Sequence, residues 1–200
     1  MKLLIQKGEL RPVRHNLQTR KQELKNQLLT VYSKIELKYD KTAYLKNYFS
    51  IINQDMINDF SVYSKVVGWS FPVTTVEQAE WFQRAAHDQK NKRFTICLKD
   101  GGQPVGMVTI SNIDWQNRSA THGIKLHPNC PKGEGIGTDA VMTLMKYAFE
   151  EMNLNRLDGS WMEDNIPSEK LYLKCGWTIE GIKKDAIFRN GKYHNLKITG

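Results

Sequence analysis

The stretch that decides the fold is residues 126–152, which read LHPNCPKGEGIGTDAVMTLMKYAFEEM. Its centre, Gly133-x-Gly135-x-Gly137, follows a β-type segment and precedes a run whose apolar residues recur three and four apart. Glycines at such a turn let backbone amides approach an anion, and the free N–H groups of a helix's first turn carry a partial positive charge of ~0.5 e. Lys132 adds a full charge at the rim, so the loop predicts a pyrophosphate site.

Two other phosphate-binding motifs fit this loop poorly. A P-loop requires a lysine between the last glycine and the Ser or Thr, and Gly137-Thr138 lacks it. A dinucleotide-binding fold places its glycines after the first strand of a βαβ unit, with an acidic residue ~20 residues later at a strand end. Here the loop comes late, after a predicted hairpin, and Asp158 lies inside the next predicted strand. The glycines alone leave a plain helix-capping turn open.

The flanking segments predict a mixed α/β (α+β) domain. Alternating and short apolar runs predict strands, and Asp100-Gly101-Gly102 and Asn190-Gly191 predict hairpin turns. The strands are expected at 34–39, 94–98, 105–110, 120–126, 156–162, from 177, and at 186–188 and 193–198. Helices are expected at 17–31, 41–52, 56–63, 75–89, 138–152 and 168–175.

Two of these helices carry finer predictions. Thr74 and Glu77 form a capping box, and the helix that follows is expected to bury Ala79, Phe82 and Ala86. In the helix over 138–152 the inward residues are expected to be Val141, Leu144, Met145, Ala148 and Phe149.

Length and charge divide the chain into two parts. Its 200 residues suit one domain with a real core, and the net charge is +8. Residues 1–34 hold eight Lys or Arg and two Asp or Glu, which leaves only +2 for the rest. We therefore expect a basic, helical extension over 1–33 and one domain over 34–200, which stops at Gly200 just after a strand. Because the positive charge is concentrated in the extension, we expect nucleic-acid binding, if the protein binds nucleic acid, to involve only residues 1–33.

Cysteine usage and hydropathy indicate the compartment. The three cysteines, Cys97, Cys130 and Cys175, stand far apart, which argues against a disulfide framework and against a zinc site. The N-terminal apolar run is three residues, and no stretch approaches the ~18–20 apolar residues of a membrane span. We expect a soluble cytoplasmic protein that needs no metal.

The residues downstream of the loop indicate which kind of phosphate-containing ligand it binds. Lys132 to Gly137 resembles the coenzyme A motif of GNAT acetyltransferases, Q/R-x-x-G-x-G/A, with lysine in place of arginine or glutamine. Asn165 to Ser168 and Leu171 to Trp177 resemble the family's N-x-x-S and L-Y-x-K-x-G-F blocks. Glu180-Gly181 and residues 191–194 are similar to the subgroup that acetylates ribosomal-protein N-termini and polyamines. The resemblance covers about residues 34–200.

This resemblance implies a fold and a cofactor site. The GNAT-like sheet is mixed and mostly antiparallel, its central strands splay apart, and helices flank it. The pantetheine arm of acetyl-CoA would insert between the splayed strands, pair with backbone near Leu126 and contact Asn165. The pyrophosphate would sit on the amides of the glycine loop, which run through these residues: Lys132, Gly133, Glu134, Gly135, Ile136, Gly137 and Thr138.

The resemblance also implies direct attack of an amine on the thioester. Tyr172 matches the family's general acid, and a phenol of pKa ~10 protonates a leaving thiolate well. Relatives place a glutamate base before the loop, where this chain has Thr121 and His122. His122 becomes the candidate base because its ordinary pKa is ~6.5. Asp114 and Glu77 are weaker options for the base.

The nucleophile, the acceptor and the partners stay open. A ping-pong mechanism would use Cys130, which lies in a basic loop, or Cys175. No acidic cluster indicates a polyamine, so a peptide N-terminus, an amino sugar or another small amine is expected, bound near the early helices, the Trp69 loop and the last hairpin. Trp69, Phe71, Trp115 and Tyr193 are candidate lining residues. A homodimer remains open. The alternative is a non-catalytic scaffold that binds acyl-CoA, or RNA or another partner through the arm.

Overall fold

The computed structural model describes residues 34–38, 58, 62, 64–68, 73–86 and 88–200. The predicted helices over 17–31 and 41–52 lie outside these residues, as does the Trp69 loop. Of the helix predicted over 56–63, only Asn58 and Val62 are described, and both are helical. No helix in the described part is both long and apolar enough to cross a membrane.

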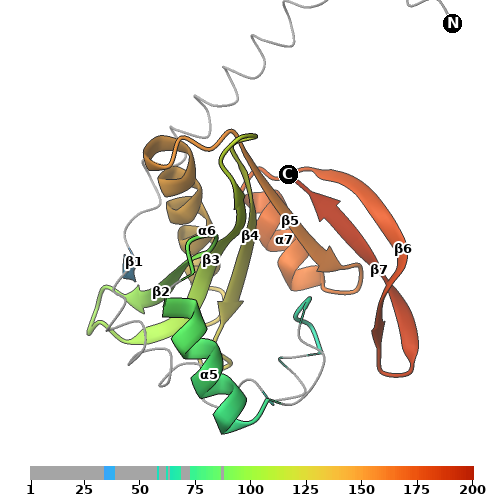
Figure 1. Cartoon of the computed structure of the whole chain (residues 1–200), viewed down its shortest axis with the longest axis horizontal. Helices are drawn as coiled ribbons and strands as arrows, with labels where there is room; N and C mark the ends of the chain where they lie inside the picture. The colour runs from blue at the N-terminus through green and yellow to red at the C-terminus, as the bar shows by residue number, and fades with distance from the viewer. Residues whose placement is uncertain (1–33, 39–57, 59–61, 63, 69–72, 87) are drawn as a thin grey trace, which may run out of the picture.

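A seven-stranded sheet organises the described residues in the order β1-β2-β3-β4-β5-β7-β6 (Figure 1). Every neighbouring pair is antiparallel except β4 and β5, which are parallel. The strands are β1 (Ile35–Lys38), β2 (Lys92–Leu98), β3 (Pro104–Asp114), β4 (Ser119–Leu126), β5 (Arg156–Met162), β6 (Ile179–Arg189) and β7 (Lys192–Thr199). The predicted mixed, mostly antiparallel sheet is confirmed, and residues 34–38 belong to it.

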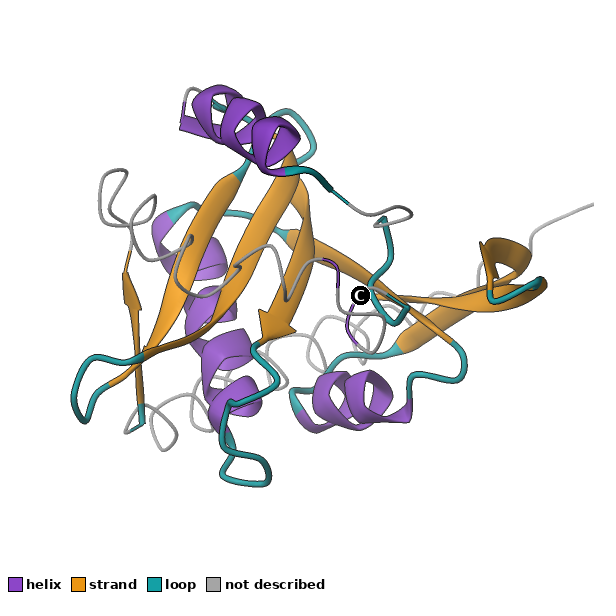
Figure 2. Ribbon diagram, turned by 90° about the horizontal axis from the view of Figure 1, so that it is seen from below, coloured by secondary structure: helices purple, strands orange, loops and turns teal. Residues whose placement is uncertain are grey.

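Helices lie on both faces of the sheet (Figure 2). They are α5 (Thr75–Ala86), α6 (Ile136–Lys146), the π-helical turn η1 (Tyr147–Glu151) and α7 (Ile166–Lys174). The core forms where α6 packs on side chains that alternate along β2 and β3, among them Ile96, Val108 and Ile110, each fully buried. The opposite face carries Arg93, whose guanidinium lies 5.2 Å from the Trp81 ring of α5.

The helix after the glycine loop differs from its prediction at both ends. It begins at Ile136, because Gly135 adopts a left-handed φ of 81° at the N-cap and turns the chain into the helix two residues early. At the other end the Met152 amide bonds to the Tyr147 carbonyl, which widens the turn. Phe149 is therefore 37% exposed, and its predicted inward position is wrong. The other four predicted inward residues are buried.

The start of α5 confirms the capping box. The Glu77 amide donates to Thr74 Oγ1 at 3.2 Å, and the Thr74 amide donates to Glu77 Oε2 at 2.9 Å. The predicted burial of Ala79 is wrong: Ala79 is exposed, whereas Gln78 is buried. The physical reason is that the sheet face beneath α5 is polar, so the helix turns a polar residue inward. The side chains of Phe82 and Ala86 are not described.

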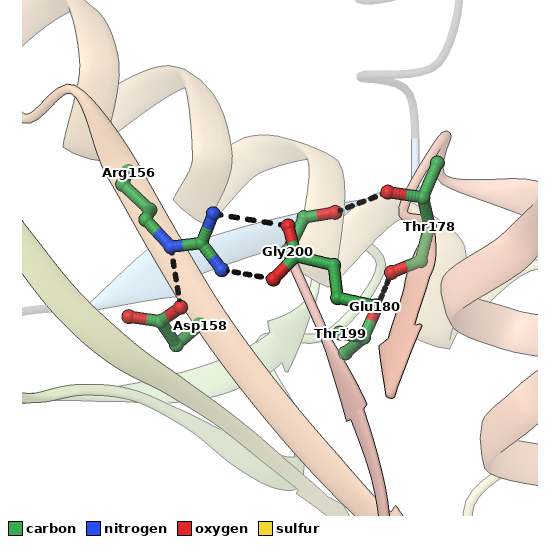
Figure 3. A network of polar contacts seen from close by, with 6 residues as sticks. All are labelled: Arg156, Asp158, Thr178, Glu180, Thr199 and Gly200. Carbon is green, nitrogen blue, oxygen red and sulfur yellow. Dashed lines mark hydrogen bonds and ion pairs between the residues drawn. The ribbon is translucent and has the colours of Figure 1, made fainter. Parts of the chain in front are cut away.

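A polar network closes the end of the sheet where β5 starts (Figure 3). Arg156 Nε donates to Asp158 at 2.6 Å, and its two terminal nitrogens bond to both carboxylate oxygens of Glu180 on β6. The guanidinium thus bridges β5 and β6 across the end of β7. Gly200 lies beneath it, and a Cβ there would lie 2.6 Å from Arg156 Nη2, so a side chain at this position would displace the guanidinium.

Candidate active site

The site begins where β4 and β5 part. They pair only from Ser119 with Arg156 to Thr121 with Asp158, after which β5 pairs with β7 alone and leans away from β4 (Figure 1). The His127 amide bonds to Val105 on β3. By strand alternation, the backbone groups of Ile124 and Leu126 point the other way, into the gap. The predicted splay of the central strands is thus present.

A cavity of about 660 Å³ opens into this gap. Its walls come from β3, β4, β5, α7, Val62 and residues 65–67. Of the residues predicted for the site, it brings together Tyr172, His122, Leu126, Lys132 and Asn165. The size suits a ligand of several functional groups, since small-molecule sites span ~300–1,000 Å³.

The glycine loop stands at the rim as an anion site. Gly133 and Gly135 have φ of 78° and 81°, and a Cβ on either would point into open space. The first bond of the helix runs from the Asp139 amide to the Gly135 carbonyl. Among the described residues, no hydrogen bond engages the amides of residues 132–138. These donors are therefore available to a phosphate at a helix N-terminus.

The remaining predicted loop residues surround that rim. Glu134 is exposed, and its carbonyl accepts a hydrogen bond from Lys34 Nζ. Ile136 is buried and anchors α6 in the core. The Cα of Gly137 faces Leu126 and Leu171, which a Cβ would meet at 3.4–3.5 Å. Thr138 lies in the first turn, and its carbonyl is 4.0 Å from the Cys175 sulfur.

Tyr172 is a buried polar side chain in the cavity wall. It lies on α7, 4% exposed, with its ring stacked on Trp161 at 5.2 Å and edge-on to Trp177. Its hydroxyl is 2.9 Å from His122 Nδ1. Burial raises the pKa of Tyr172 above its ordinary value, so the phenol keeps its proton until a strong base draws it away.

His122 faces Tyr172 from β4. The imidazole is 4% exposed and packs edge-on to Trp177 at 5.4 Å. Burial lowers the pKa of His122 to about 3, because the cation would have to leave water. Its Nε2 is buried and has no hydrogen-bond partner among the described residues. The histidine is therefore neutral and bound to the predicted acid.

Asn165 stabilises the start of α7. It is the N-cap of α7, where its Oδ1 accepts from the Ser168 amide at 3.3 Å. Its Nδ2 donates to the Lys65 carbonyl at 3.4 Å. The predicted contact with a cofactor arm is untested, although Asn165 does line the cavity.

The other candidates for the general base, and the candidate nucleophiles, do not line the cavity. Glu77 caps α5, and Asp114 caps the turn after β3 through Asn117. Burial raises the pKa of Cys130, and it raises that of Cys175 to about 12, so neither is a ready thiolate. In the described part of the chain, no three His, Cys, Asp or Glu residues gather as a metal site requires.

The predicted aromatic lining differs from the observed one. Trp115 and Tyr193 are 58% and 64% exposed and do not line the cavity, because they lie at hairpin turns. Trp69 and Phe71 lie outside the described residues. Besides Tyr172, the aromatic side chain of Trp161 lines the cavity, and the sequence predicted only that this residue lies in a strand.

Sequence reasoning also missed the polar wall of β3 and β4. Thr109, Ser111, Thr121 and Lys125 share the sheet face that α5 approaches, and all four line the cavity. Strand alternation placed them on one face, and that signal was available in the sequence. Burial, followed by the charge of Arg93, lowers the pKa of Lys125 to about 8, which leaves it mostly charged at neutral pH.

Comparison with known proteins agrees with this geometry. Residues 41–178 match the family model described as "Acetyltransferase (GNAT) domain". The chain belongs to the GNAT acetyltransferase family. Spermidine N(1)-acetyltransferase of Escherichia coli (strain K12) is 30% identical over 120 residues, 60% of this chain and 63% of that protein. A putative ribosomal N-acetyltransferase of Bacillus subtilis (strain 168), YdaF, is 35% identical over 95 residues, 48% of this chain and 51% of that protein.

Solved GNAT structures show the same fold. Spermidine N-acetyltransferase from Vibrio cholerae, in complex with CoA and spermine, superposes with a TM-score of 0.70 at 22% identity, over 82% of this chain and 93% of that one. The match to the E. coli protein spans less than two thirds of that relative's length.

Proposed function

We propose that this GNAT domain transfers an acetyl group from acetyl-CoA to a primary amine by direct attack. The observation that carries the proposal is that the glycine loop and the Tyr172 hydroxyl border the same cavity. The glycine loop offers free amides at its rim, and the Tyr172 hydroxyl lies in its wall. An anion-binding helix start next to a buried phenol suits a cosubstrate with a pyrophosphate and a thioester.

The residues present fit acetyl-CoA. The amides of residues 132–138 and the charge of Lys132 would hold the pyrophosphate, although lysine lacks the bidentate geometry of arginine. The gap-facing backbone of Ile124 and Leu126 would pair with the amide groups of the pantetheine arm. When bound, acetyl-CoA supplies an electrophilic thioester carbonyl at the end of that arm.

Tyr172 would act as the general acid. A thiolate leaves more easily when a nearby group protonates it, and a neutral phenol is a suitable donor. The enclosure of Tyr172 by Trp161 and Trp177 excludes water and fixes the ring. The stacked Trp161 would therefore fix the direction of the hydroxyl where Tyr172 borders the cavity.

The lining residues favour an acceptor other than a polyamine. Thr109, Ser111, Thr121 and Ser160 present hydroxyls, and three lysines add positive charge. Among the described residues that line the cavity, none is acidic. A polycation would gain no charge pairing from this wall, whereas a peptide N-terminus or an amino sugar would find hydrogen-bond partners. The names of the spermidine-acetylating relatives make the polyamine the second candidate.

Calorimetric titration with acetyl-CoA tests the cofactor site. Gly135→Glu puts a carboxylate where the phosphate must lie, and we expect its affinity to fall ~10²-fold or more. Gly191→Glu is the matched control, because Gly191 also has a positive φ and open space but lies at the tip of the β6–β7 hairpin. Equal affinities in the two variants would show that the loop is not the phosphate site.

Thiol release with a panel of amines separates the remaining alternatives. Turnover with an amino sugar or a peptide but little with spermidine would support the proposed acceptor class. Turnover with spermidine alone would support the second candidate. Acetyl-CoA binding without turnover on any amine would favour the scaffold, whose RNA affinity should then fall with salt and vanish when residues 1–33 are removed.

A further inference from the structure

The contact between His122 and Tyr172 joins one particular imidazole nitrogen to the phenol oxygen. Tyr172 Oη is 2.9 Å from Nδ1 of His122, and the two rings stand nearly perpendicular at 88°. No other hydrogen bond to this hydroxyl is found in the described part of the chain. Among the described residues, the His122 imidazole is therefore the group that sets the direction of the Tyr172 O–H bond.

A neutral imidazole can meet the phenol in two ways. If Nδ1 accepts, the Tyr172 hydrogen points at His122 and away from the cavity, and the imidazole hydrogen sits on Nε2. That N–H would be buried without a partner among the described residues, an arrangement that folded proteins avoid. If Nδ1–H donates, Nε2 is a buried acceptor without a partner among the described residues, which folded proteins tolerate better than a buried N–H without one. The Tyr172 oxygen is then held from behind, and its own hydrogen is free to face the cavity.

A role for His122 as the base for the amine is hard to reconcile with its surroundings. Nδ1 is occupied by the Tyr172 hydroxyl, and Nε2 is sealed from solvent. The ring lies against Trp177 and contacts no described carboxylate that could stabilise an imidazolium. The low pKa of His122 agrees with this, since such a group stays neutral at any working pH.

We propose that His122 is a positioning residue, whose Nδ1–H donates to the Tyr172 oxygen and keeps the Tyr172 hydrogen directed at the cavity. The inference rests on the proposed function. In the reaction, the amine nitrogen forms a bond to the thioester carbonyl carbon, the carbon–sulfur bond breaks, and the sulfur takes the Tyr172 proton. The tyrosinate oxygen, stabilised by the Nδ1–H donor, regains a proton from the nitrogen that became positive on attack. The proton count therefore balances, and His122 gains and loses none.

Three variants at position 122 test this assignment. His122→Asn places an amide close to the position of Nδ1, His122→Gln places one close to Nε2, and His122→Phe removes both nitrogens. We expect kcat to fall ~10–100-fold in the Gln and Phe variants and less than ~5-fold in the Asn variant, because only Asn can still donate to Tyr172. The KM values should stay near wild type, and thermal unfolding with acetyl-CoA titration confirms that each variant is folded.

The decisive measurement is the double variant with Tyr172→Phe. If His122 acts through the tyrosine, His122→Phe costs activity in the wild-type background and none in the Tyr172→Phe background. A loss of kcat that persists in that background would overturn the inference, because His122 would then act independently, as a base would. Equal kcat values for the Asn and Gln variants would overturn it as well.

Two further outcomes separate this inference from the proposed function. Wild-type kcat in Tyr172→Phe would remove the acid and the inference with it, while acetyl transfer itself would stand. In ¹⁵N-labelled protein, His122 should carry its proton on Nδ1 and that signal should be lost in His122→Asn, whereas the Nδ1–H signal of His194, whose Nδ1 lies 3.1 Å from Asp164 Oδ2, should remain. A proton on Nε2 of His122 would overturn the proposed polarity.

Discussion

Lys34 Nζ donates a 2.7 Å hydrogen bond to the carbonyl oxygen of Glu134, a residue 100 positions later in the glycine loop. The same region is tied a second time, because Asp139 Oδ2 accepts the backbone amides of Lys34 and Ile35 at 3.1 Å each. The start of β1 thus holds both the loop and the first turn of α6. The geometry of the proposed phosphate site depends on a segment far away in sequence.

Asp139→Ala should destabilise the protein and loosen the loop. The change leaves two amides at the start of β1 without their acceptor, which costs about 1–3 kcal/mol of unfolding free energy. Asp139→Asn keeps an acceptor oxygen and should lose less. Urea unfolding measures the stability, and calorimetry with acetyl-CoA should show a several-fold weaker affinity for the Ala variant. Wild-type values in both measurements would mean that this anchor does not support the loop.

Burial of His122 predicts a specific pH dependence of stability. In the unfolded chain the imidazole titrates near its ordinary pKa of 6.5, whereas in the folded protein that pKa falls to about 3. The unfolded state therefore binds more protons between these values, and this part of the stability is present above pH 6.5 and is lost as the pH falls.

From pH 7 to pH 5, wild type should lose about 2 kcal/mol more unfolding free energy than His122→Phe. Urea unfolding of both proteins at the two pH values gives this difference directly, because the other titrating groups are common to both. Equal losses would show that His122 is accessible to protons in the folded state.

The sequence predicted the elements best where a local pattern and the tertiary environment agree. The capping box at Thr74 and Glu77, the order of the strands along the chain and the glycine loop follow from local chemistry alone. Phe149 and Ala79 were placed wrongly because their orientation depends on a wide helical turn and on a polar sheet face, and neither has a local signal. Periodicity locates a helix but leaves its rotation to the surface beneath it.

The candidate site likewise contains residues that a local motif predicted and residues that only tertiary packing brings together. Lys132 to Thr138 and Tyr172 were predicted because a motif carries them, and the structure brings Lys132 and Tyr172 to one cavity. The pairing of Tyr172 with His122 joins residues 50 apart in sequence, so only the packing of α7 against β4 could reveal it. Lys125 was missed because a lone lysine on a strand usually points to solvent.

Lys125 predicts the charge preference of the acceptor site. Lys125→Glu replaces a cation in the cavity wall with a carboxylate, which should raise kcat/KM for spermidine relative to an amino sugar by ~10-fold. Lys170→Glu makes the same change at an exposed position of α7 outside the cavity and should leave the ratio unaltered. Rates of thiol release with both amines give the ratio. An unchanged ratio in Lys125→Glu would mean that the acceptor binds elsewhere.

The Arg156 network predicts a salt-sensitive coupling at the opposite end of β5. Arg156 bridges Asp158 and Glu180, and all three side chains are about 40% exposed. Arg156→Met should cost about 1 kcal/mol at low ionic strength and less in 1 M NaCl, because salt screens such pairs. Gly200→Ala should destabilise wild type more than it does Arg156→Met, since the new methyl group meets the guanidinium. Urea unfolding of the single and double variants measures this coupling, and strictly additive losses would show that the guanidinium does not cross Gly200 in solution.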